Sequence, residues 1–443
     1  EAGLQAGDII MEINGKDMAQ GDRTPNELTS YVSDNLRGDP GTTCVLKLER
    51  PTADSTYIPM ELKITRGTIR TNPVPYYGMV DKNIGYIAIS TFAIEGCSKD
   101  IKKALIELKQ QGATSIVLDL RGNGGGLLSE AVNVVNFFVP KGKEIVVTKG
   151  KIKQAGSTYK TSNEPIDMEI PLTVLVDGAT ASAAEIVSGS LQDLDRAVIV
   201  GNRTYGKGLV QVPRELPYNS SMKVTTAKYY IPSGRCIQAI DYAKRNADGS
   251  VARIPDSLTT VFHTAAGREV RDGGGIRPDV EVKAERFPNI MFYLLNDDMI
   301  FDYATQYCIK HPNIGEVKDF SVTDADYDDF KQMLKKRNFT YDRQSEKSLK
   351  NLKEIAEFEG YMEGASEEFA ALEKKLTHNL DHELNRFSKQ IRKAIAEEIV
   401  KRHYFQRGVI LERMKDDANL TKAIETLKDK EGYTKILSVP ADK

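Results

Sequence analysis

The alternation of apolar strands with helices between residues 85 and 200 constrains the fold more than any other feature of this sequence. We expect strands at the apolar segments 85–92, 115–120, 172–176 and 197–200. We expect helices between them, at 99–109, 131–139 and 182–192. Nearly continuous apolar strands are typical of a sheet buried on both faces, and strands that alternate with helices are typical of α/β domains. The pattern predicts an α/β core over residues 67–284.

Residues 1–66 show a different, mixed pattern. Strand-like runs are expected at 9–13, 43–48 and 57–65. Thr24-Pro25-Asn26-Glu27 predicts the start of a helix that runs to about Leu36, because Thr, Pro and Glu occupy the positions that a capping box requires. We therefore expect a small α+β module in front of the core.

Residues 285–443 are rich in Lys, Glu, Asp and Leu and predict a helical C-terminal domain. Four-residue repeats that mark one face of a helix occur at Leu372, Leu376, Leu380 and Leu384, and at Ile391, Ile395 and Ile399. The most polar part, Tyr327–Arg343, is a candidate linker. The expected fold class is a multidomain α/β protein.

The composition argues against several kinds of protein. The chain has 61 Lys and Arg against 63 Asp and Glu, a net charge of −2, which disfavours a nucleic-acid-binding protein held by phosphate contacts. No apolar run approaches the roughly 20 residues of a membrane helix, so we expect no membrane span. The 4 cysteines are far apart and show no CxxC pair, so neither a zinc site nor a dense disulfide framework is expected. We expect no cofactor. The sequence begins at Glu1 with no leader, so position 1 looks like a cut, and any signal peptide is expected to lie outside it or to have been removed.

The first candidate for chemistry is the glycine cluster after the strand at 115–120. Asp119-Leu120-Arg121-Gly122-Asn123-Gly124-Gly125-Gly126 leads from a strand into a helix. Such a loop can be a flexible turn, or its free N–H groups can bind an oxyanion. A dinucleotide fingerprint fails because Leu127 stands where its third glycine would be.

The second candidate is Ser182, which follows a buried strand at the start of the helix at 182–192. Small neighbours leave room for a substrate carbonyl at Ser182 and leave the N–H of Ala183 exposed at the helix start. An N-capping role and a nucleophilic role both fit this position. None of the 5 histidines stands where it would activate the serine, so a Ser-His-Asp triad is not indicated.

The third candidate is Lys207. The segment Gly201–Lys207 matches the G-x-x-x-x-G-K of a P-loop, but Gly208 replaces the Ser or Thr that would hold Mg²⁺, and a strand pattern follows. A lysine between glycines and apolar residues could instead be held partly out of water as a neutral base, oriented by Gln211. A solvated lysine in a hairpin is the alternative.

Together these segments resemble the carboxyl-terminal processing proteases, or tail-specific proteases, which use a Ser-Lys dyad. The resemblance covers residues 1 to about 284. It rests on Gly85-Tyr86-Ile87, Phe92, Asp119 to Gly125, Thr180 to Ile186, Gln192-Asp193, Arg196-Ala197, Gly206-Lys207-Gly208, Gln211, Tyr230 to Arg235, and Gly275-Ile276-x-Pro278-Asp279. At position 180, Thr stands where Ser is common.

The resemblance implies a role for each matching residue. Ser182 would be the nucleophile, Lys207 the general base and Gln211 the residue that orients the lysine. The backbone N–H of Ala183 and one from Gly124 or Gly125 would form the oxyanion hole. The implied substrates are proteins or peptides selected by their C-terminal tails, and the family's usual compartment is the bacterial cell envelope, in particular the periplasm.

The flanking regions complete the expectation. Residues 1–66 resemble a PDZ domain, which in this family captures a substrate tail as an added strand. Its first strand and carboxylate-binding loop would precede Gly3-Leu4, so we expect a truncated domain. By analogy, the helical region 285–443 would cage the site, join copies of the chain into a homo-oligomer or bind a partner. A PDZ-containing scaffold with an inactive protease core and a P-loop nucleotide binder are the alternative functions.

Overall fold

The structure, a computed structural model, describes residues 2–19, 21–54, 56–151, 156–245, 248–285, 287–376 and 379–438. The chain forms two compact units that do not follow the linear order of the sequence. The first, which we call the helical unit, consists of Glu1–Ile69 and Glu285–Lys415. The second, which we call the sheet unit, consists of Arg70–Ala284 and Asp416–Lys443.

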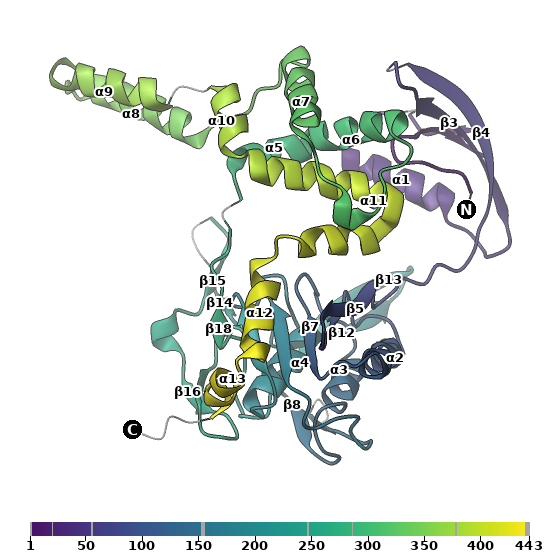
Figure 1. The fold of residues 1–443 in the computed structure, drawn as a ribbon. Helices are drawn as coiled ribbons and strands as arrows, with labels where there is room; N and C mark the ends of the chain where they lie inside the picture. The colour runs from purple at the N-terminus through teal and green to yellow at the C-terminus, as the bar shows by residue number, and fades with distance from the viewer. Residues whose placement is uncertain are drawn as a thin grey trace. The chain divides into compact units, whose positions relative to one another are not determined.

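A six-stranded sheet lies at the centre of the sheet unit (Figure 1). Its strand order is β18-β11-β10-β7-β6-β5, and all neighbours are parallel except β5, which runs antiparallel at one edge. The strands are β5 (Tyr76–Asp81), β6 (Ile84–Ala88), β7 (Ser115–Asp119), β10 (Leu172–Val176), β11 (Val198–Gly201) and β18 (Val280–Glu281). The predicted strands at 115–120, 172–176 and 197–200 are confirmed, and β6 is shorter than the predicted 85–92.

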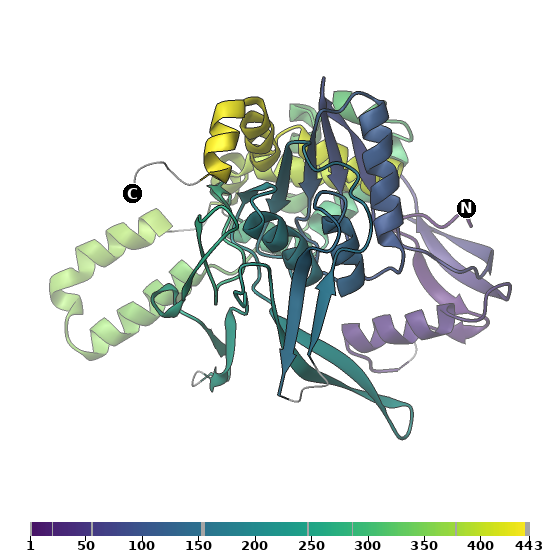
Figure 2. The ribbon, with the colours of Figure 1, turned by 90° about the horizontal axis from the view of Figure 1, so that it is seen from below.

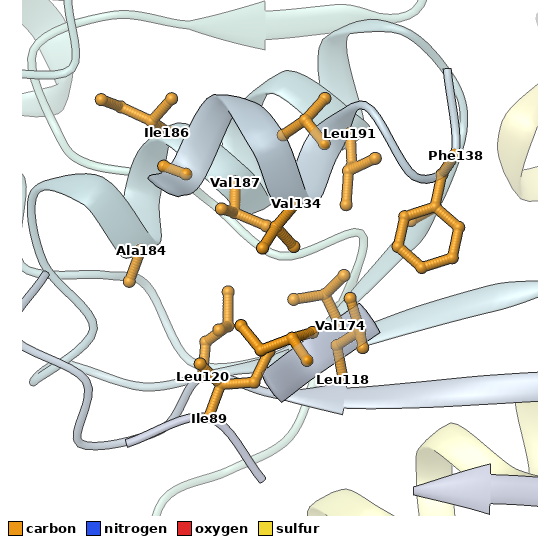
Figure 3. Packing of buried hydrophobic residues seen from close by; sticks show 14 of the residues in the cluster. Ile89, Leu118, Leu120, Val134, Phe138, Val174, Ala184, Ile186, Val187 and Leu191 are labelled. Carbon is orange, nitrogen blue, oxygen red and sulfur yellow. The ribbon is translucent and has the colours of Figure 1, made fainter. Parts of the chain in front are cut away.

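Helices α2 (Cys97–Gln110), α3 (Leu128–Val135) and α4 (Ala183–Asp193) cover one face of this sheet. Figure 3 shows Val134 of α3 and Val187 of α4 packed over Leu118 and Val174 of the sheet. These residues are fully buried and belong to the largest apolar cluster of the sheet unit. The predicted α/β core is confirmed.

The opposite face of the sheet is covered by the end of the chain. Side chains alternate between the two faces of a strand, so Val117, Leu175 and Val200 point away from α2, α3 and α4, and all three are fully buried. Helix α12 (Ala418–Lys428) packs against β7, β10 and β11, and α13 (Lys430–Leu437) follows it. Residues 416–443 therefore group with the sheet, whereas the sequence pattern assigned them to the helical region.

The remaining strands of the sheet unit form a second sheet and two hairpins. The order of the second sheet is β12-β13-β8-β9, and its β12–β13 hairpin is the long teal ribbon in Figure 2. The bounds are β8 (Glu144–Gly150), β9 (Ser157–Lys160), β12 (Leu209–Leu216), β13 (Ser220–Tyr230), β14 (Ile240–Arg245), β15 (Val251–Arg253), β16 (Val261–His263) and β17 (Glu269–Arg271).

The helical unit combines the N-terminal α+β module with most of the C-terminal helices. Its sheet has the order β2-β1-β3-β4 and lies with α1, whose capping box at Thr24 is formed as predicted. The bounds are β1 (Ile9–Ile13), β2 (Lys16–Asp17), α1 (Pro25–Leu36), β3 (Thr43–Pro51) and β4 (Tyr57–Thr65). The helices are α5 (Asn289–Asn296), α6 (Met299–Lys310), α7 (Asp324–Lys336), α8 (Gln344–Phe358), α9 (Met362–Leu376), α10 (Leu380–Arg386) and α11 (Ser388–Met414).

Two expectations for the helical region need correction. Tyr327–Arg343 is not a linker, because most of it forms α7, whose buried Tyr327, Phe330 and Leu334 recur at helical spacing within a polar sequence. The leucine repeat from Leu372 to Leu384 is divided between α9 and α10 instead of lying on one helix. The isoleucine repeat does lie on one buried face of α11.

Candidate active site

Two loops meet at the carboxyl edge of the six-stranded sheet. The glycine loop, residues 120–127, follows β7, and the turn 177–182 follows the neighbouring β10 and leads into α4. Loops after parallel neighbouring strands emerge at the same edge. A Cβ placed on Gly125 would lie 2.7 Å from Ser182 Cβ and 2.8 Å from Ala183 N. The structure thus places the glycine loop directly against Ser182 and Ala183.

Ser182 has a backbone conformation that an ordinary capping serine does not adopt. Its φ is 57° and its ψ is −119°, whereas an N-cap residue normally has extended angles. A non-glycine residue with positive φ is strained, and such strain occurs at functional sites when the surroundings hold it in place. The conformation therefore favours the nucleophilic interpretation of Ser182 over the capping one.

The backbone N–H groups around Ser182 differ in their partners. The N–H of Gly125 donates to Asn123 Oδ1 at 2.9 Å. Within the described residues, no hydrogen bond is found for the N–H of Ala183 or Gly124. Of the three groups expected to stabilise an oxyanion, those of Ala183 and Gly124 are therefore available to a ligand in this conformation.

Asn123 holds the glycine loop in position. Its side chain is fully buried, and its Nδ2 donates to the carbonyl oxygen of Ile89 at 2.8 Å. Its own carbonyl oxygen accepts from the N–H of Ala181 at 2.9 Å. The loop is thus tied both to the end of β6 and to the residue that precedes Ser182.

Lys207 lies on the connection between β11 and β12. This connection has no helix where a P-loop requires one, since strand β12 starts at Leu209. Lys207 and Gln211 line a cavity of about 590 Å³ together with Gly124, Ala181, Tyr205 and Tyr242. The structure therefore brings two of the predicted site residues into one cavity with the glycine loop.

The Ser-Lys pair is not joined by a hydrogen bond in this conformation. Among the described residues, no hydrogen bond connects Lys207 Nζ with Ser182 Oγ or with the side chain of Gln211. Catalytic hydrogen bonds are often long without substrate and tighten in the complex.

Glu185 is a site residue to which the sequence reasoning gave no role. Its carboxylate is fully buried and accepts hydrogen bonds from the N–H groups of Ser182 at 2.9 Å, Gly206 at 2.7 Å and Lys207 at 2.8 Å. It also accepts from the hydroxyl of Thr204. One carboxylate therefore holds the backbone of both members of the proposed dyad.

Burial raises the pKa of Glu185 to about 7, although the hydrogen bonds to Thr204, Lys207, Gly206 and Ser182 act in the opposite direction. All four partners are donors, so they suit the ionised form. The sequence held one signal for this residue, because Glu185 occupies the third helical position after Ser182, where a capping-box glutamate is expected.

Tyr229 of β13 contacts the backbone carbonyl oxygens of the same two residues, Ser182 and Lys207. Its hydroxyl donates to the carbonyl oxygen of Lys207 and lies 3.3 Å from that of Ser182. Burial holds the pKa of this phenol well above its usual range, so it remains a donor. No local sequence pattern marks Tyr229, because its role depends on the packing of β13.

The family positions Asp193 and Arg196 have structural contacts. Asp193 forms a buried ion pair with Arg235, at 2.8 Å. Arg196 donates to the carbonyl oxygen of Phe138 at 3.0 Å. In the part of the chain that the structure describes, no group of three or more His, Cys, Asp and Glu side chains is arranged to hold a metal ion. The same part contains no helix with the length and apolar character to cross a membrane.

Comparisons with known proteins match two segments of the chain. Residues 83–244 match Peptidase family S41, and residues 290–427 match the C-terminal helical domain of a probable PDZ-protease. The second segment crosses the boundary between the two units and ends within α12.

Individual relatives agree with these matches. A carboxy-terminal-processing protease of Bartonella bacilliformis is 38% identical over 246 residues, which is 54% of this chain and 53% of the relative. A probable CtpA-like serine protease of Staphylococcus haemolyticus is 35% identical over 239 residues, 54% of this chain and 45% of the relative. Among solved structures, a photosystem II D1 C-terminal processing protease is 30% identical, with 65% of this chain and 66% of that chain covered and a TM-score of 0.36.

The chain spans about half the length of the curated relatives it matches. The matched region includes the glycine loop, Ser182, Lys207 and Gln211. The similarity to Peptidase family S41 therefore lies in residues 83–244, and the curated relatives that match this part of the chain are named carboxy-terminal-processing proteases.

Proposed function

We propose that this chain is a serine endopeptidase that cleaves protein substrates with a Ser-Lys dyad. The observation that carries the proposal is the contact of the glycine loop with Ser182 and Ala183, where Gly125 leaves no room for a side chain. The strained φ of Ser182 and the position of Lys207 on the wall of the adjoining cavity support it.

The first step is the attack of Ser182 on the scissile carbonyl. Lys207, as a neutral amine, takes the hydroxyl proton while Ser182 Oγ forms a bond to the carbonyl carbon. This requires the lysine side chain to turn toward Ser182 when substrate binds, with Gln211 orienting its amine. Glu185 and Tyr229 hold the backbone of Ser182 and Lys207 during that movement.

The developing oxyanion is stabilised by the N–H groups of Ala183 and Gly124. Ala183 is the first residue of α4, so the helix N-terminus adds a favourable dipole. Loss of one donor of this kind typically raises the barrier by about 3 kcal/mol.

The reaction then proceeds through an acyl-enzyme. The carbon–nitrogen bond breaks as the protonated Lys207 returns a proton to the leaving amine. A water molecule then loses a proton to Lys207 and attacks the ester carbon of the acylated Ser182. The bond between this carbon and Ser182 Oγ breaks, Lys207 returns the proton to Oγ, and the second product leaves with a new carboxyl group.

We further propose that substrates are selected by their C-terminal tails. Residues 1–66 would act as a PDZ-like domain, an assignment supported by the four-stranded sheet, α1 and the match of residues 290–427 to a PDZ-protease domain. Association of copies through the helical domain and a location in the bacterial cell envelope stay predictions from the family.

The proposal is tested with Ser182→Ala and Lys207→Ala in the full chain. Both variants should lose cleavage of unfolded casein by at least about a thousandfold, because the nucleophile or its base is gone. The matched control is Lys223→Ala, an exposed lysine of β13 that should keep wild-type turnover.

Circular dichroism verifies that each variant is folded. Wild-type turnover in either dyad variant would show that the assignment is wrong. A wild-type chain that binds peptides but cleaves none would favour an inactive PDZ-containing scaffold.

A further inference from the structure

A buried cluster of charged side chains lies at the start of the glycine loop. Arg121, the second residue of that loop, places its guanidinium between Asp119 and Asp417. Its Nη1 and Nη2 donate to the two carboxylate oxygens of Asp417 at 3.0 and 2.7 Å, and its Nε donates to Asp119 at 3.0 Å. The hydroxyl of Tyr86 donates to Asp119 at 2.6 Å. Bidentate pairs of this kind fix the orientation of the guanidinium.

The cluster is shielded from water. The side chains of Asp417 and Asp119 are 8% and 9% exposed, and that of Arg121 is 22% exposed. Contact with Arg121 keeps the pKa of Asp417 below its usual range although burial acts in the opposite direction. The two carboxylates in turn keep Arg121 fully protonated. Asp417 and Arg121 are therefore both charged, and removing either one leaves an unbalanced charge in this shielded cluster.

Asp417 comes from a distant part of the chain. It is the N-cap of α12 and accepts from the N–H of Leu420 at 3.0 Å. Only Lys415 and Asp416 separate it from the last residue of α11, in the helical unit. Asp417 thus lies outside residues 83–244, which match Peptidase family S41 and contain the proposed dyad, and inside residues 290–427, which match the helical domain of a probable PDZ-protease.

Arg121 is connected by the backbone to the oxyanion donors. Gly122, the next residue, donates its N–H to Asp177 Oδ1 at 3.1 Å, and Gly124 follows two residues later. Gly124 carries one of the two open N–H groups at the site. A shift of Arg121 therefore moves the start of the loop that presents this donor.

We propose that Asp417 is a positioning residue for the oxyanion loop. By holding Arg121, it couples the donor at Gly124 to α12, near the end of the chain. Displacement of α12 releases Arg121 and weakens oxyanion stabilisation without removing a group that touches substrate. This inference depends on the proposed peptidase function.

The test compares Asp417→Asn with the control Asp429→Asn in the full chain. Asparagine caps helices well, so Asp417→Asn keeps α12 capped and removes only the ionic contact with Arg121. Asp429→Asn changes the N-cap of α13, which accepts from Gly432, and leaves Arg121 untouched. We expect kcat for casein cleavage to fall about tenfold in Asp417→Asn, with KM within about twofold, and to stay unchanged in Asp429→Asn.

A second measurement distinguishes positioning from general destabilisation. A peptide boronic acid forms a tetrahedral adduct with Ser182 and places a negative oxygen in the oxyanion site. Its inhibition constant should rise about tenfold in Asp417→Asn, whereas the affinity for a cleaved peptide product should not change. Asp417→Glu restores the carboxylate and should recover at least half of the lost kcat.

Each outcome has one meaning. Wild-type kcat and boronic acid inhibition in Asp417→Asn would overturn the inference, as would equal losses in Asp417→Asn and Asp429→Asn or no recovery with Asp417→Glu. If Ser182→Ala keeps its turnover in the same assay, the proposed peptidase function is refuted, whatever the result for Asp417→Asn. An inactive Ser182→Ala beside a fully active Asp417→Asn refutes only the role of Asp417.

Discussion

Replacement of Gly125 with alanine is the sharpest steric test of the proposed site. The added Cβ would lie 2.7 Å from Ser182 Cβ, 2.7 Å from the carbonyl oxygen of Ala181 and 2.8 Å from Ala183 N. Carbon atoms in ordinary contact are about 3.5 Å apart, so the loop and the start of α4 must separate by about 0.8 Å. The φ of Gly125 is +95°, and an alanine at such a position adds about 1–2 kcal/mol of strain.

A displacement near 1 Å at a reacting centre can lower the rate about a hundredfold. We therefore expect kcat for casein or peptide cleavage to fall by about that factor in Gly125→Ala, while KM changes less than about threefold. The matched control is Gly112→Ala, in the turn after α2, which has the same φ of +95° and nothing within 4 Å of the added Cβ. Initial rates of both variants over a range of substrate concentrations give the kcat and KM values that test this prediction. A Gly125→Ala enzyme within about threefold of wild type would refute the proposed contact between the loop and Ser182.

Four further predictions concern three buried residues. Burial raises the pKa of Glu185 to about 7 in the folded chain, from 4.5 in the unfolded chain. Between these pH values the folded state binds one more proton than the unfolded state, so the free energy of unfolding falls by about 3 kcal/mol as pH rises from 4.5 to above 7. Denaturant unfolding at pH 5 and pH 8 should show this loss in the wild type and not in Glu185→Gln. The same carboxylate holds the dyad when ionised, so kcat should rise with pH through about 7, and a rate independent of pH between 6 and 8 would contradict this role. Tyr229→Phe removes the donor to the Lys207 carbonyl and should lower stability by about 1 kcal/mol and kcat several-fold, both measured against the wild type. Asp193→Asn breaks the buried pair with Arg235 and should lower unfolding stability by about 3 kcal/mol or more, while the folded fraction keeps its kcat.

The parts of the fold that depend on local pattern could be predicted from the sequence. The apolar runs at 115–120 and 172–176 contain the strands β7 and β10 because a strand buried on both faces has few positions for polar residues. The shared site of the glycine loop and Ser182 was implied by the family resemblance, and the structure explains it, because the loops after the parallel neighbours β7 and β10 emerge at one edge.

The parts that depend on long-range packing could not be predicted. The contacts of Glu185 with Gly206 and Lys207 join segments about 20 residues apart, and those of Tyr229 require β13 to fold over the site. The repeat of Leu420, Ala423 and Leu427 identifies an apolar helix face but not the surface that it covers. For the same reason the sequence could not assign α12 to the sheet.

The position of α12 has a consequence for the biosynthesis of the protein. A ribosome makes residues 70–284 long before residues 416–438, so the strands β7, β10 and β11 are synthesised well before the helix that covers one of their faces. Until α12 emerges, Val117, Leu175 and Val200 have no covering layer from the end of the chain, and an apolar surface of this kind favours aggregation or chaperone binding. A nascent chain thus contains Ser182 and Lys207 before it contains the last layer of its own core.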